Sequence, residues 1–440
     1  MVSSGRNGLL MALFSRNHRI ILLLSLVTTT TSFLGTEFIH RPILPRCRSF
    51  SDNGSNRQAV RTAAPSSSDK VEHLTHIDRV LCISDLHTDH VDNMRWLRDR
   101  TNSSSSSFEN LTSSDLIVVA GDISHELTTL EKSLTYLLQH GSSVLFVPGN
   151  HEGWLNAKQS EDGNSLEKLR RVYETCHRLG VLTGCTMVGG TADRPHALWL
   201  GPLESWYDGS LAIEGCEDLC DDFGSWPWVD FIRCRWPDFP PIPDGPNKRI
   251  PSGLTEYFHK QNHHILDALQ HSIQQSNIPG SRAVMTVSHF LPNKQCLPDW
   301  KDVESSEFLR DSWLDHGASG VSAKFAKVAG TMLLDDQIRS YLQIPDDMRR
   351  MHLFGHSHRP KDFEMGNIRY IHNPLGKPRE RDCCMVSPEV DFQTVWDTKS
   401  GEVPGETVIR FWEEKGGGVE KLKERMANSR RRSRYSQRNA

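Results

Sequence analysis

Short runs of apolar residues recur along the chain, and each run is followed by polar residues. Five such runs occupy positions 79–84, 116–120, 144–147, 283–287 and 351–354. Continuous runs of β-branched and other apolar side chains that stop at Gly, Pro or a polar residue are typical of buried strands. Segments 91–98, 126–139, 165–179 and 258–275 are helical candidates between them. The alternation of strands and helices predicts an α/β fold.

The residues that follow these runs are of the kinds that bind metal ions or take part in catalysis. They form the clusters Asp85-Leu-His87, Gly121-Asp122, Gly149-Asn150-His151-Glu152, Ser288-His289 and Gly355-His356-Ser-His358. Loops at the carboxyl ends of buried strands face solvent while the strands hold them rigidly, so α/β folds build their sites there. We therefore expect these clusters to form the functional site.

The clusters offer imidazole, carboxylate and amide groups, which zinc, manganese and iron accept as ligands. No cysteine belongs to the set, which argues against a structural zinc site. In Asp85-Leu-His87 and His356-Ser-His358, one intervening residue places both side chains on the same side of an extended segment. A glycine precedes three candidate ligands and is expected to permit the sharp turn that aims each of them: Asp122, Asn150 and His356.

Each residue has an ordinary alternative role when it is considered alone. Asp85 or Asp122 at a strand end could cap a following helix, and His289 could be a hydrogen-bonded core histidine. His356 and His358 could be surface residues. Five such clusters in one chain favour a metal site over five separate coincidences.

Charge is distributed unevenly along the chain of 440 residues, in which 51 Lys and Arg stand against 55 Asp and Glu. Residues 1–70 hold nine basic and three acidic residues, and residues 420–440 hold eight and two. With a formal total of −4, the segment 71–419 therefore carries a net charge of −16. This acidic excess makes nucleic acid an unexpected partner. The length allows two or three domains, or one large α/β domain with extensions.

The first 70 residues have the composition of a targeting presequence followed by a disordered linker. Arg16, His18 and Arg19 precede a short apolar run, 20–27, typical of a signal-peptide core, and a stretch rich in Arg and Ser follows. Together the two parts resemble the plastid presequence of algae with complex plastids. We therefore predict a plastid protein that is soluble after processing, with the secretory pathway, the mitochondrion and membrane anchoring as alternatives. Residues 416–440 are expected to form a basic disordered tail.

The five clusters, in this order, resemble the motif set of the calcineurin-like metallophosphoesterase superfamily over roughly residues 77–380. Segments 205–207, 234–237 and 373–381 are similar to uncharacterised plant and algal members. The resemblance implies a two-sheet α/β sandwich flanked by helices, with the metal site at the carboxyl ends of the strands. The corresponding domain would occupy residues 71–415.

The resemblance also implies two divalent metal ions, which could be manganese, iron or zinc. Their ligands would be Asp85, His87 and His358 for one ion, Asn150, His289 and His356 for the other, and Asp122 as the bridge between them. A hydroxide shared by the ions would attack the phosphorus of a phosphomonoester or phosphodiester in line with the leaving group. Catalysis would depend on Asp122 and on His151 as the general acid. Glu152 would orient His151 or form a surface salt bridge.

Position 125 separates this chain from two branches of the superfamily. Protein Ser/Thr phosphatases have an aspartate at the corresponding position and purple acid phosphatases have a tyrosine, whereas this chain has His125. The remaining resemblance is to the phosphodiesterase-like branch, so the expected substrate is a small phosphorylated molecule.

Residues 153–281 are more than two strands need for a connection, and we expect them to form a cap that selects the substrate. Asn150 is a further candidate for contact with the substrate. So is one of Lys377, Arg379 and Arg381, because a guanidinium suits bidentate contact with a phosphate. The alternative function is a non-catalytic binding or interaction protein that acts through its basic tail.

Overall fold

The structure is a computed structural model that describes residues 70–101, 110–155, 163–245, 247–278, 280–300, 303, 319–418 and 420–428. The chain divides into the units Met1–Ala59 and Val60–Ala440, and all described residues belong to the second unit. The predicted presequence and its plastid address therefore lie outside the described residues, apart from Lys70. Within the described part, no helix has the length and apolar character that a membrane span requires.

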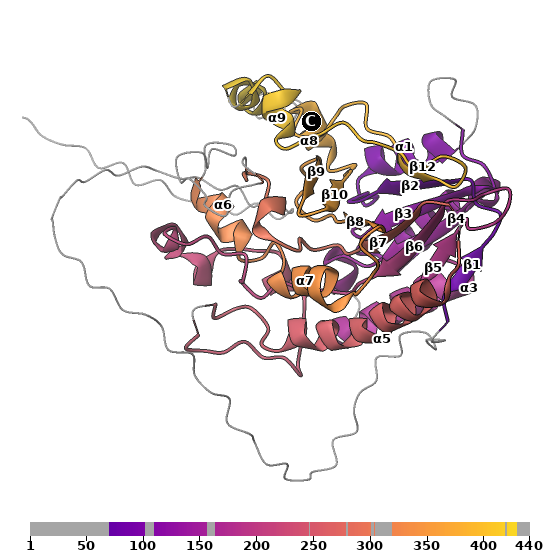
Figure 1. Cartoon of the computed structure of the whole chain (residues 1–440). Helices are drawn as coiled ribbons and strands as arrows, with labels where there is room; N and C mark the ends of the chain where they lie inside the picture. The colour runs from indigo at the N-terminus through magenta and orange to yellow at the C-terminus, as the bar shows by residue number, and fades with distance from the viewer. Residues whose placement is uncertain are drawn as a thin grey trace, which may run out of the picture. The chain divides into compact units, whose positions relative to one another are not determined.

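Two β-sheets form the core of the second unit, and Figure 1 labels their strands except β11. The smaller sheet has five strands in the order β12-β11-β2-β3-β4. In that order their bounds are Gly401–Glu402, Gln393–Asp397, Arg79–Ile83, Asp115–Ala120 and Ser143–Val147. Strands β2, β3 and β4 run parallel, so their carboxyl ends lie at the same edge of the sheet.

The larger sheet has seven strands in the order β1-β5-β6-β7-β8-β10-β9. In that order their bounds are Glu72–Leu74, Thr186–Val188, Ala197–Pro202, Arg282–Val287, Arg349–Leu353, Ile368–His372 and Lys361–Met365. Strands β6, β7, β8 and β10 are parallel neighbours. A parallel bridge between Ser84 and Pro374 joins the two sheets just beyond β2 and β10.

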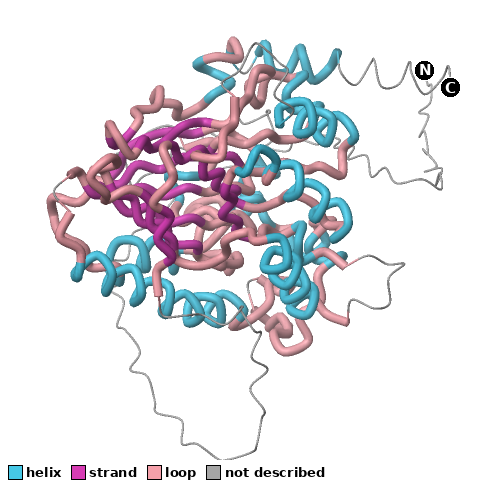
Figure 2. The backbone as a smooth tube through the Cα atoms, turned by 90° about the vertical axis from the view of Figure 1, so that its right-hand side faces the viewer, coloured by secondary structure: helices cyan, strands magenta, loops and turns pink. Residues whose placement is uncertain are grey.

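The two faces of each central strand enter different parts of the core. In β3, Leu116 and Val118 face the other sheet, whereas Ile117 and Val119 pack toward the helices. Because both faces are covered, the strands are apolar at successive positions, which explains the continuous runs in the sequence. Figure 2 shows the strands grouped together with helices outside them. The predicted two-sheet α/β sandwich is confirmed.

The helical candidates correspond to the helices α1 (Val91–Thr101), α2 (Leu127–Leu137), α3 (Ser165–Leu179) and α5 (Leu254–Gln275). Helix α3 has a capping box at its start, in which Asn164 and Glu167 exchange hydrogen bonds, and it ends at Gly180 with a φ of +75°. These two signals explain why the expected bounds of α3 agree with the structure. Helices α1, α2 and α3 pack on the smaller sheet, and α5 packs on β6 of the larger one.

Short helices occupy the connections between these elements. The α-helices among them are α4 (Asp230–Arg233), α6 (Ser319–Ala326), α7 (Met332–Asp336), α8 (Pro378–Asp382) and α9 (Phe411–Glu414). The 3-10 helices are η1 (Gln139–Gly141), η2 (His151–Gly153), η4 (Glu217–Cys220), η5 (Phe223–Ser225) and η6 (Lys294–Cys296), and η9 (Gln337–Tyr341) is a π-helix.

The segment 153–281 is not the single cap that the sequence suggested. It contains α3 and α5, and it supplies two strands of the larger sheet, β5 and β6. The part that contributes neither a strand nor a long helix is residues 203–253, which we call the insert. The helices of the insert are short: α4, η4 and η5.

The expected disordered tail, 416–440, is folded where the structure describes it. Residues 420–428 are helical, and Leu422 is buried in a cluster with Cys383, Met385 and Trp412. The prediction of a disordered tail is therefore wrong for residues 420–428. Arg430 and the basic residues after it lie outside the described residues.

We expect Leu116→Ala to lower the free energy of unfolding by about 2–5 kcal/mol, because Leu116 is fully buried between the sheets and its truncation leaves a cavity. Urea unfolding followed by circular dichroism measures this change. Ile242→Ala is the control, since Ile242 is 58% exposed and its truncation should change stability by less than about 0.5 kcal/mol. Equal unfolding midpoints for the two variants would contradict the assignment of Leu116 to the core.

Candidate metal centre

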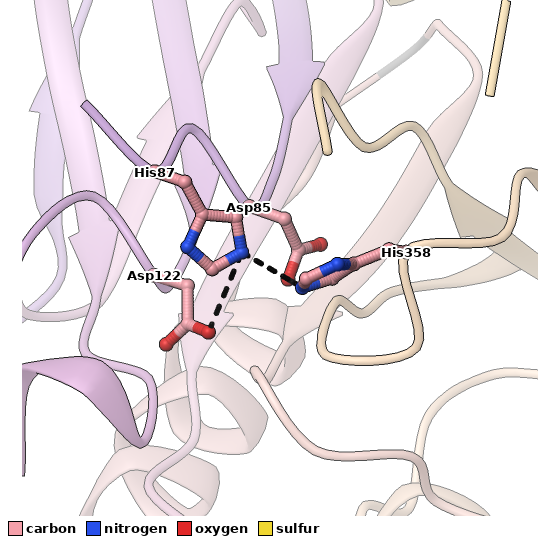
Figure 3. A group of neighbouring side chains, drawn as sticks. All are labelled: Asp85, His87, Asp122 and His358. Atoms are coloured by element: carbon pink, nitrogen blue, oxygen red, sulfur yellow. Dashed lines mark hydrogen bonds and ion pairs between the residues drawn. The ribbon is translucent and has the colours of Figure 1, made fainter. Parts of the chain in front are cut away.

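The strand ends bring the predicted ligands together in one place. Two groups of described side chains could each hold a metal ion: Asp85, His87, Asp122 and His358, and Asp122, His289 and His356. In each group, one potential ligand atom of every residue lies within 4.8 Å of the others. Asp122 belongs to both groups. Figure 3 shows the first group, with its side chains directed toward one another.

The side chains of the first group come from the ends of β2, β3 and β8. Nε2 of His87 lies 2.7 Å from Nε2 of His358 and 4.0 Å from Oδ2 of Asp122. Nε2 of His358 lies 3.4 Å from Oδ1 of Asp85. All of these side chains are buried. Two imidazole nitrogens and two carboxylates directed at one small volume are a donor set that suits a divalent cation.

The second group comes from the ends of β3, β4, β7 and β8. Nε2 of His289 lies 3.4 Å from Oδ1 of Asp122. Oδ1 of Asn150 lies 3.0 Å from Nε2 of His289 and 3.0 Å from Nδ1 of His356. Asn150 therefore joins this group through its amide oxygen. The structure thus brings all seven predicted ligands together.

Five candidate ligands have backbone φ angles in the left-handed region: Asp85 (52°), His87 (42°), Asp122 (56°), His356 (71°) and His358 (51°). Residues other than glycine are strained there, at a cost on the order of 1–3 kcal/mol each, and such strain concentrates at functional sites. The expectation of extended segments at Asp85-Leu-His87 and His356-Ser-His358 is therefore wrong. Each pair nevertheless directs both side chains into the site.

The glycines beside the ligands are needed mainly for space. Gly121 has a φ of +79°, and a Cβ there would lie 2.3 Å from Nδ1 of His289. A Cβ at Gly149 would lie 2.3 Å from Oδ1 of Asp122, and a Cβ at Gly355 would lie 2.6 Å from a backbone oxygen of β3. Of the three expected turns, the one at Gly121 is confirmed, whereas Gly149 and Gly355 permit close approach.

Hydrogen bonds on the outer side of the imidazole rings select the nitrogen that faces the site. Nδ1 of His358 donates to Oε2 of Glu380 at 2.9 Å, and Nδ1 of His289 donates to the last backbone oxygen of β3 at 2.9 Å. Nε2 of His356 donates to the backbone oxygen of Val328 at 3.0 Å. The opposite nitrogen of each ring therefore directs its lone pair into the site.

Asp85 is held by three donors on its own side of the site. It accepts hydrogen bonds from Oγ of Ser84 at 2.5 Å, from Nε2 of His372 at 3.1 Å and from the backbone N–H of His356 at 2.9 Å. Burial acts to raise the pKa of Asp85, but His358 and His372 outweigh it and hold this pKa well below its usual value. Asp85 is therefore an ionised candidate ligand.

Burial shifts the pKa of four further candidate ligands. It lowers the pKa of His289 to about 4 and holds the pKa of His87 and of His356 well below the usual value. These rings are therefore neutral and keep a lone pair for a cation. Burial and the negative charge of Glu152 raise the pKa of Asp122 well above its usual value. A cation would relieve this cost, so the residues present fit a metal site.

Glu152 has neither of the roles that the sequence suggested, because it is fully buried and bonded to the backbone. Its Oε1 accepts hydrogen bonds from the N–H groups of Ile123 and Ser124 at 2.9 and 3.0 Å. Its Oε2 accepts from the N–H groups of Asp122 and Gly149 at 3.0 and 2.7 Å. Glu152 therefore connects the loop after β3 to the loop after β4.

His151 lies beside the two ligand groups. Its Nε2 is 3.6 Å from Oδ2 of Asp122, and its ring is stacked on the ring of Trp154 at a centroid distance of 3.5 Å. Burial lowers the pKa of His151 well below its usual value. Nδ1 is buried without a hydrogen-bond partner among the described residues. The arrangement directs Nε2 toward the site.

The basic residues expected to contact the substrate differ in their surroundings. Arg381 donates to the backbone oxygens of Leu375 and Gly376 at 2.8 and 2.9 Å, so its guanidinium is committed to the protein. Arg379 is exposed and hydrogen-bonds to Cys383. Neither arrangement directs these guanidinium groups into the site.

Lys377 acts electrostatically on histidines of the site. Its positive charge contributes to lowering the pKa of His87 and of His151, after burial and neighbouring histidines. It is therefore the basic residue of this segment whose charge reaches the site.

His125 lies outside the two ligand groups. Its Nδ1 is 3.2 Å from Oδ2 of Asp89, and both residues form a third geometric group with His151. The side chain of Asp89 is 20% exposed, whereas the candidate ligands of the other two groups are buried.

Sequence reasoning missed four residues that contact the site: Trp154, Asp230, His372 and Glu380. His372 and Glu380 lie in or beside the segment 373–381, and Trp154 follows the cluster that contains His151. Their proximity to these motifs is the sequence signal that marks them. Asp230 lies 80 residues from Asn150, its partner in a hydrogen bond, and no local pattern marks it.

Comparisons with known proteins agree with this geometry. A family model described as calcineurin-like phosphoesterase matches residues 78–360. The acyl-carrier-protein phosphodiesterase PptH of Mycobacterium tuberculosis (strain ATCC 25618 / H37Rv) is 27% identical over 139 residues, which are 32% of this chain and 40% of that relative. The crystal structure of phosphopantetheinyl hydrolase (PptH) from Mycobacterium tuberculosis has a TM-score of 0.50 at 19% identity, covering 76% of this chain and all of that chain. The fold is therefore shared.

We expect Glu152→Gln to lower the free energy of unfolding by at least about 2 kcal/mol. The amide NH₂ of the glutamine would face the backbone N–H groups of Asp122 and Gly149, which donate to Oε2 of Glu152 in the wild type. Urea unfolding in the presence of a chelator measures this without a contribution from metal ions. Glu126→Gln is the matched control, since Glu126 is exposed and four residues from Asp122. Unchanged stability of Glu152→Gln would remove the connecting role that we assign to Glu152.

Proposed function

Because the chain belongs to the calcineurin-like phosphoesterase family, we propose that it is an enzyme that hydrolyses a phosphomonoester or a phosphodiester with two divalent metal ions. The observation that carries the proposal is that two ligand groups share Asp122. Oδ1 of Asp122 lies 3.4 Å from His289 and Oδ2 lies 4.0 Å from His87, so each oxygen is directed at a different group. One carboxylate can thus serve two cations.

The proposed ligands are Asp85, His87 and His358 for one ion, Asn150, His289 and His356 for the other, and Asp122 for both. The ions would supply Lewis-acid stabilisation of the phosphoryl oxygens and activation of the attacking water. Manganese, iron and zinc all suit imidazole, carboxylate and amide donors, so the donor set leaves the choice among them open.

His151 is the proposed proton donor to the leaving oxygen. A neutral imidazole has one N–H, and Nε2 is the nitrogen that faces Asp122 and the site. Trp154 stacks on the ring and limits its rotation. A positioned imidazole of this kind contributes about 100-fold or more to the rate by proton transfer or by stabilising the charge that develops on the leaving group.

We propose a small phosphorylated molecule as the substrate, with Lys377 as the residue that attracts its phosphate. The charge of Lys377 acts on His87 and His151, whereas Arg381 is committed to backbone oxygens. The relative PptH is named as a phosphodiesterase, which favours a diester over a monoester.

His151→Asn should lower kcat for bis-para-nitrophenyl phosphate by at least about 100-fold while the protein still binds manganese, because the ring is not among the proposed ligands. Asp122→Asn should lose both activity and manganese. Steady-state kinetics and the manganese content after gel filtration measure the two effects. His177→Asn, on the exposed surface of α3, is the control and should behave as the wild type. Wild-type turnover by His151→Asn would remove the proposed acid.

Deletion of residues 429–440 should leave turnover of the same diester unchanged, because the proposed chemistry lies in the sandwich. The deletion begins after the helix that contains Leu422, so the buried contact of Leu422 is retained. Loss of hydrolysis on this deletion would favour the alternative in which the basic tail carries the function. Kinetics with the full-length chain as reference distinguish the two.

A further inference from the structure

Asp230 is a buried carboxylate that belongs to neither ligand group but lies next to the second. It is the first residue of α4 in the insert, and its side chain is 2% exposed. A carboxylate at this depth is costly unless its oxygens accept hydrogen bonds. The identity of its donors therefore indicates what Asp230 does.

Within the described residues, the hydrogen bonds to the carboxylate of Asp230 come from side chains. Oδ1 accepts from Nδ2 of Asn150 at 2.8 Å and from Nε1 of Trp154 at 2.6 Å. Oδ2 accepts from Nε1 of Trp228 at 2.9 Å, and the hydroxyl of Tyr207 is a further partner. These donors occupy both oxygens of the carboxylate, so they fix its position from several directions.

The contact with Asn150 determines which end of the amide faces the ligand group. The NH₂ group of Asn150 can only donate, and it turns toward Asp230 because Oδ1 of Asp230 is its acceptor. Oδ1 of Asn150 is then directed at His289 and His356, 3.0 Å from a ring nitrogen of each. The opposite orientation would present an NH₂ group, which cannot bind a cation.

The contact with Trp154 acts on the other side of the site. The indole N–H is fixed by Asp230, and the indole ring stacks on His151 at 3.5 Å with an interplanar angle of 29°. The same carboxylate oxygen thus holds a candidate ligand and the surface against which the candidate proton donor rests.

We propose that Asp230 is a positioning residue through which the insert sets the amide orientation of Asn150 and the placement of Trp154 under His151. This inference rests on the proposed function, because it gives Asn150 a cation to bind. It assigns the insert a direct part in assembling the site, in addition to any contact with the substrate.

The first test is manganese binding by the full-length Asp230→Asn variant, measured by isothermal titration calorimetry without substrate. An asparagine of the same size offers one acceptor oxygen and an NH₂ group where the carboxylate offers two acceptors. The NH₂ group must therefore face either the donors of Asn150 and Trp154 or those of Trp228 and Tyr207, and their repulsion displaces the side chain that orients Asn150. We expect one of the two manganese ions to bind about 10- to 100-fold more weakly. Asp238→Asn, an exposed aspartate of the same insert, is the control and should bind as the wild type.

A double-mutant cycle separates positioning from general damage to the fold. Asn150→Ala removes the amide, so adding Asp230→Asn to it should weaken manganese binding less than about twofold further. Additive losses in the double variant would show that Asp230 acts independently of Asn150 and would overturn the proposal.

Trp154→Phe tests the other contact and retains most of the packing if Asp230→Asn folds poorly. It should lower kcat with unchanged manganese affinity, because Asn150 keeps its hydrogen bond. Unchanged kcat would overturn the part of the proposal that concerns His151.

The outcomes also distinguish this inference from the proposed function. Wild-type protein that binds two manganese ions but hydrolyses no phosphoester would refute the function, whereas weaker binding by Asp230→Asn would still support positioning. Wild-type manganese affinity in Asp230→Asn, together with hydrolysis by the wild type, would refute positioning and leave the function in place.

Discussion

The carboxylate of Glu152 fixes the two loops on which the rest of the site depends. It accepts the N–H groups of three successive residues after β3 and the N–H of Gly149 after β4. Successive N–H groups converge on one anion when the backbone alternates between right-handed and left-handed conformations, and Asp122 has a φ of +56°. The buried charge and the unusual backbone of Asp122 therefore support each other. If either changed, Asp122 would no longer lie between the two ligand groups.

The same reasoning extends to the other left-handed ligands. Their backbone groups hydrogen-bond across loops, from the N–H of Asp85 to the oxygen of Gly121 at 3.1 Å and from the N–H of His87 to the oxygen of Asp122 at 2.9 Å. The oxygen of Asp85 accepts from the N–H of Gly376 at 3.0 Å. These bonds connect loops from both sheets, and they hold Asp85 and His87 in a conformation that an isolated peptide would leave. The strain is thus balanced by contacts that exist only in the folded chain.

This dependence on long-range contacts explains which features the sequence could predict. The grouping of the candidate ligands was predictable because each follows a strand that is recognisable by its own apolar run, and because parallel strands bring their carboxyl ends to one edge. The role of Glu152 was not, since its four donors lie in two loops and become adjacent only when β3 and β4 pair. The role of Gly149 was mistaken for a turn for the same reason, because the atom that excludes a side chain there belongs to Asp122.

The segment 153–281 was harder to interpret from its sequence. Its length suggested a cap, but it contains two strands of the larger sheet, β5 with three residues and β6 with Gly201 and Pro202. Short strands with such residues carry a weak signal, and their place in the sheet is set by neighbours far away in the chain. The bounds of the insert, residues 203–253, could therefore be defined only from the strand pairing in the folded chain.

The buried acids of the site differ in how their charge is compensated, and this difference indicates where cations matter. Glu152 accepts from four N–H groups and Asp230 from the side chains of four residues, which offset part of the burial that raises the pKa of each. Asp85 has a hydroxyl, an imidazole and an N–H group.

The carboxylate of Asp122 accepts a single hydrogen bond within the described residues, from the N–H of His151 at 3.0 Å. Burial raises the pKa of Asp122 well above the usual value, so an ionised Asp122 is energetically costly in the protein alone. The acid with the fewest donors is also the one that lies in both ligand groups. Cations bound there would supply to Asp122 the compensation that the backbone supplies to Glu152.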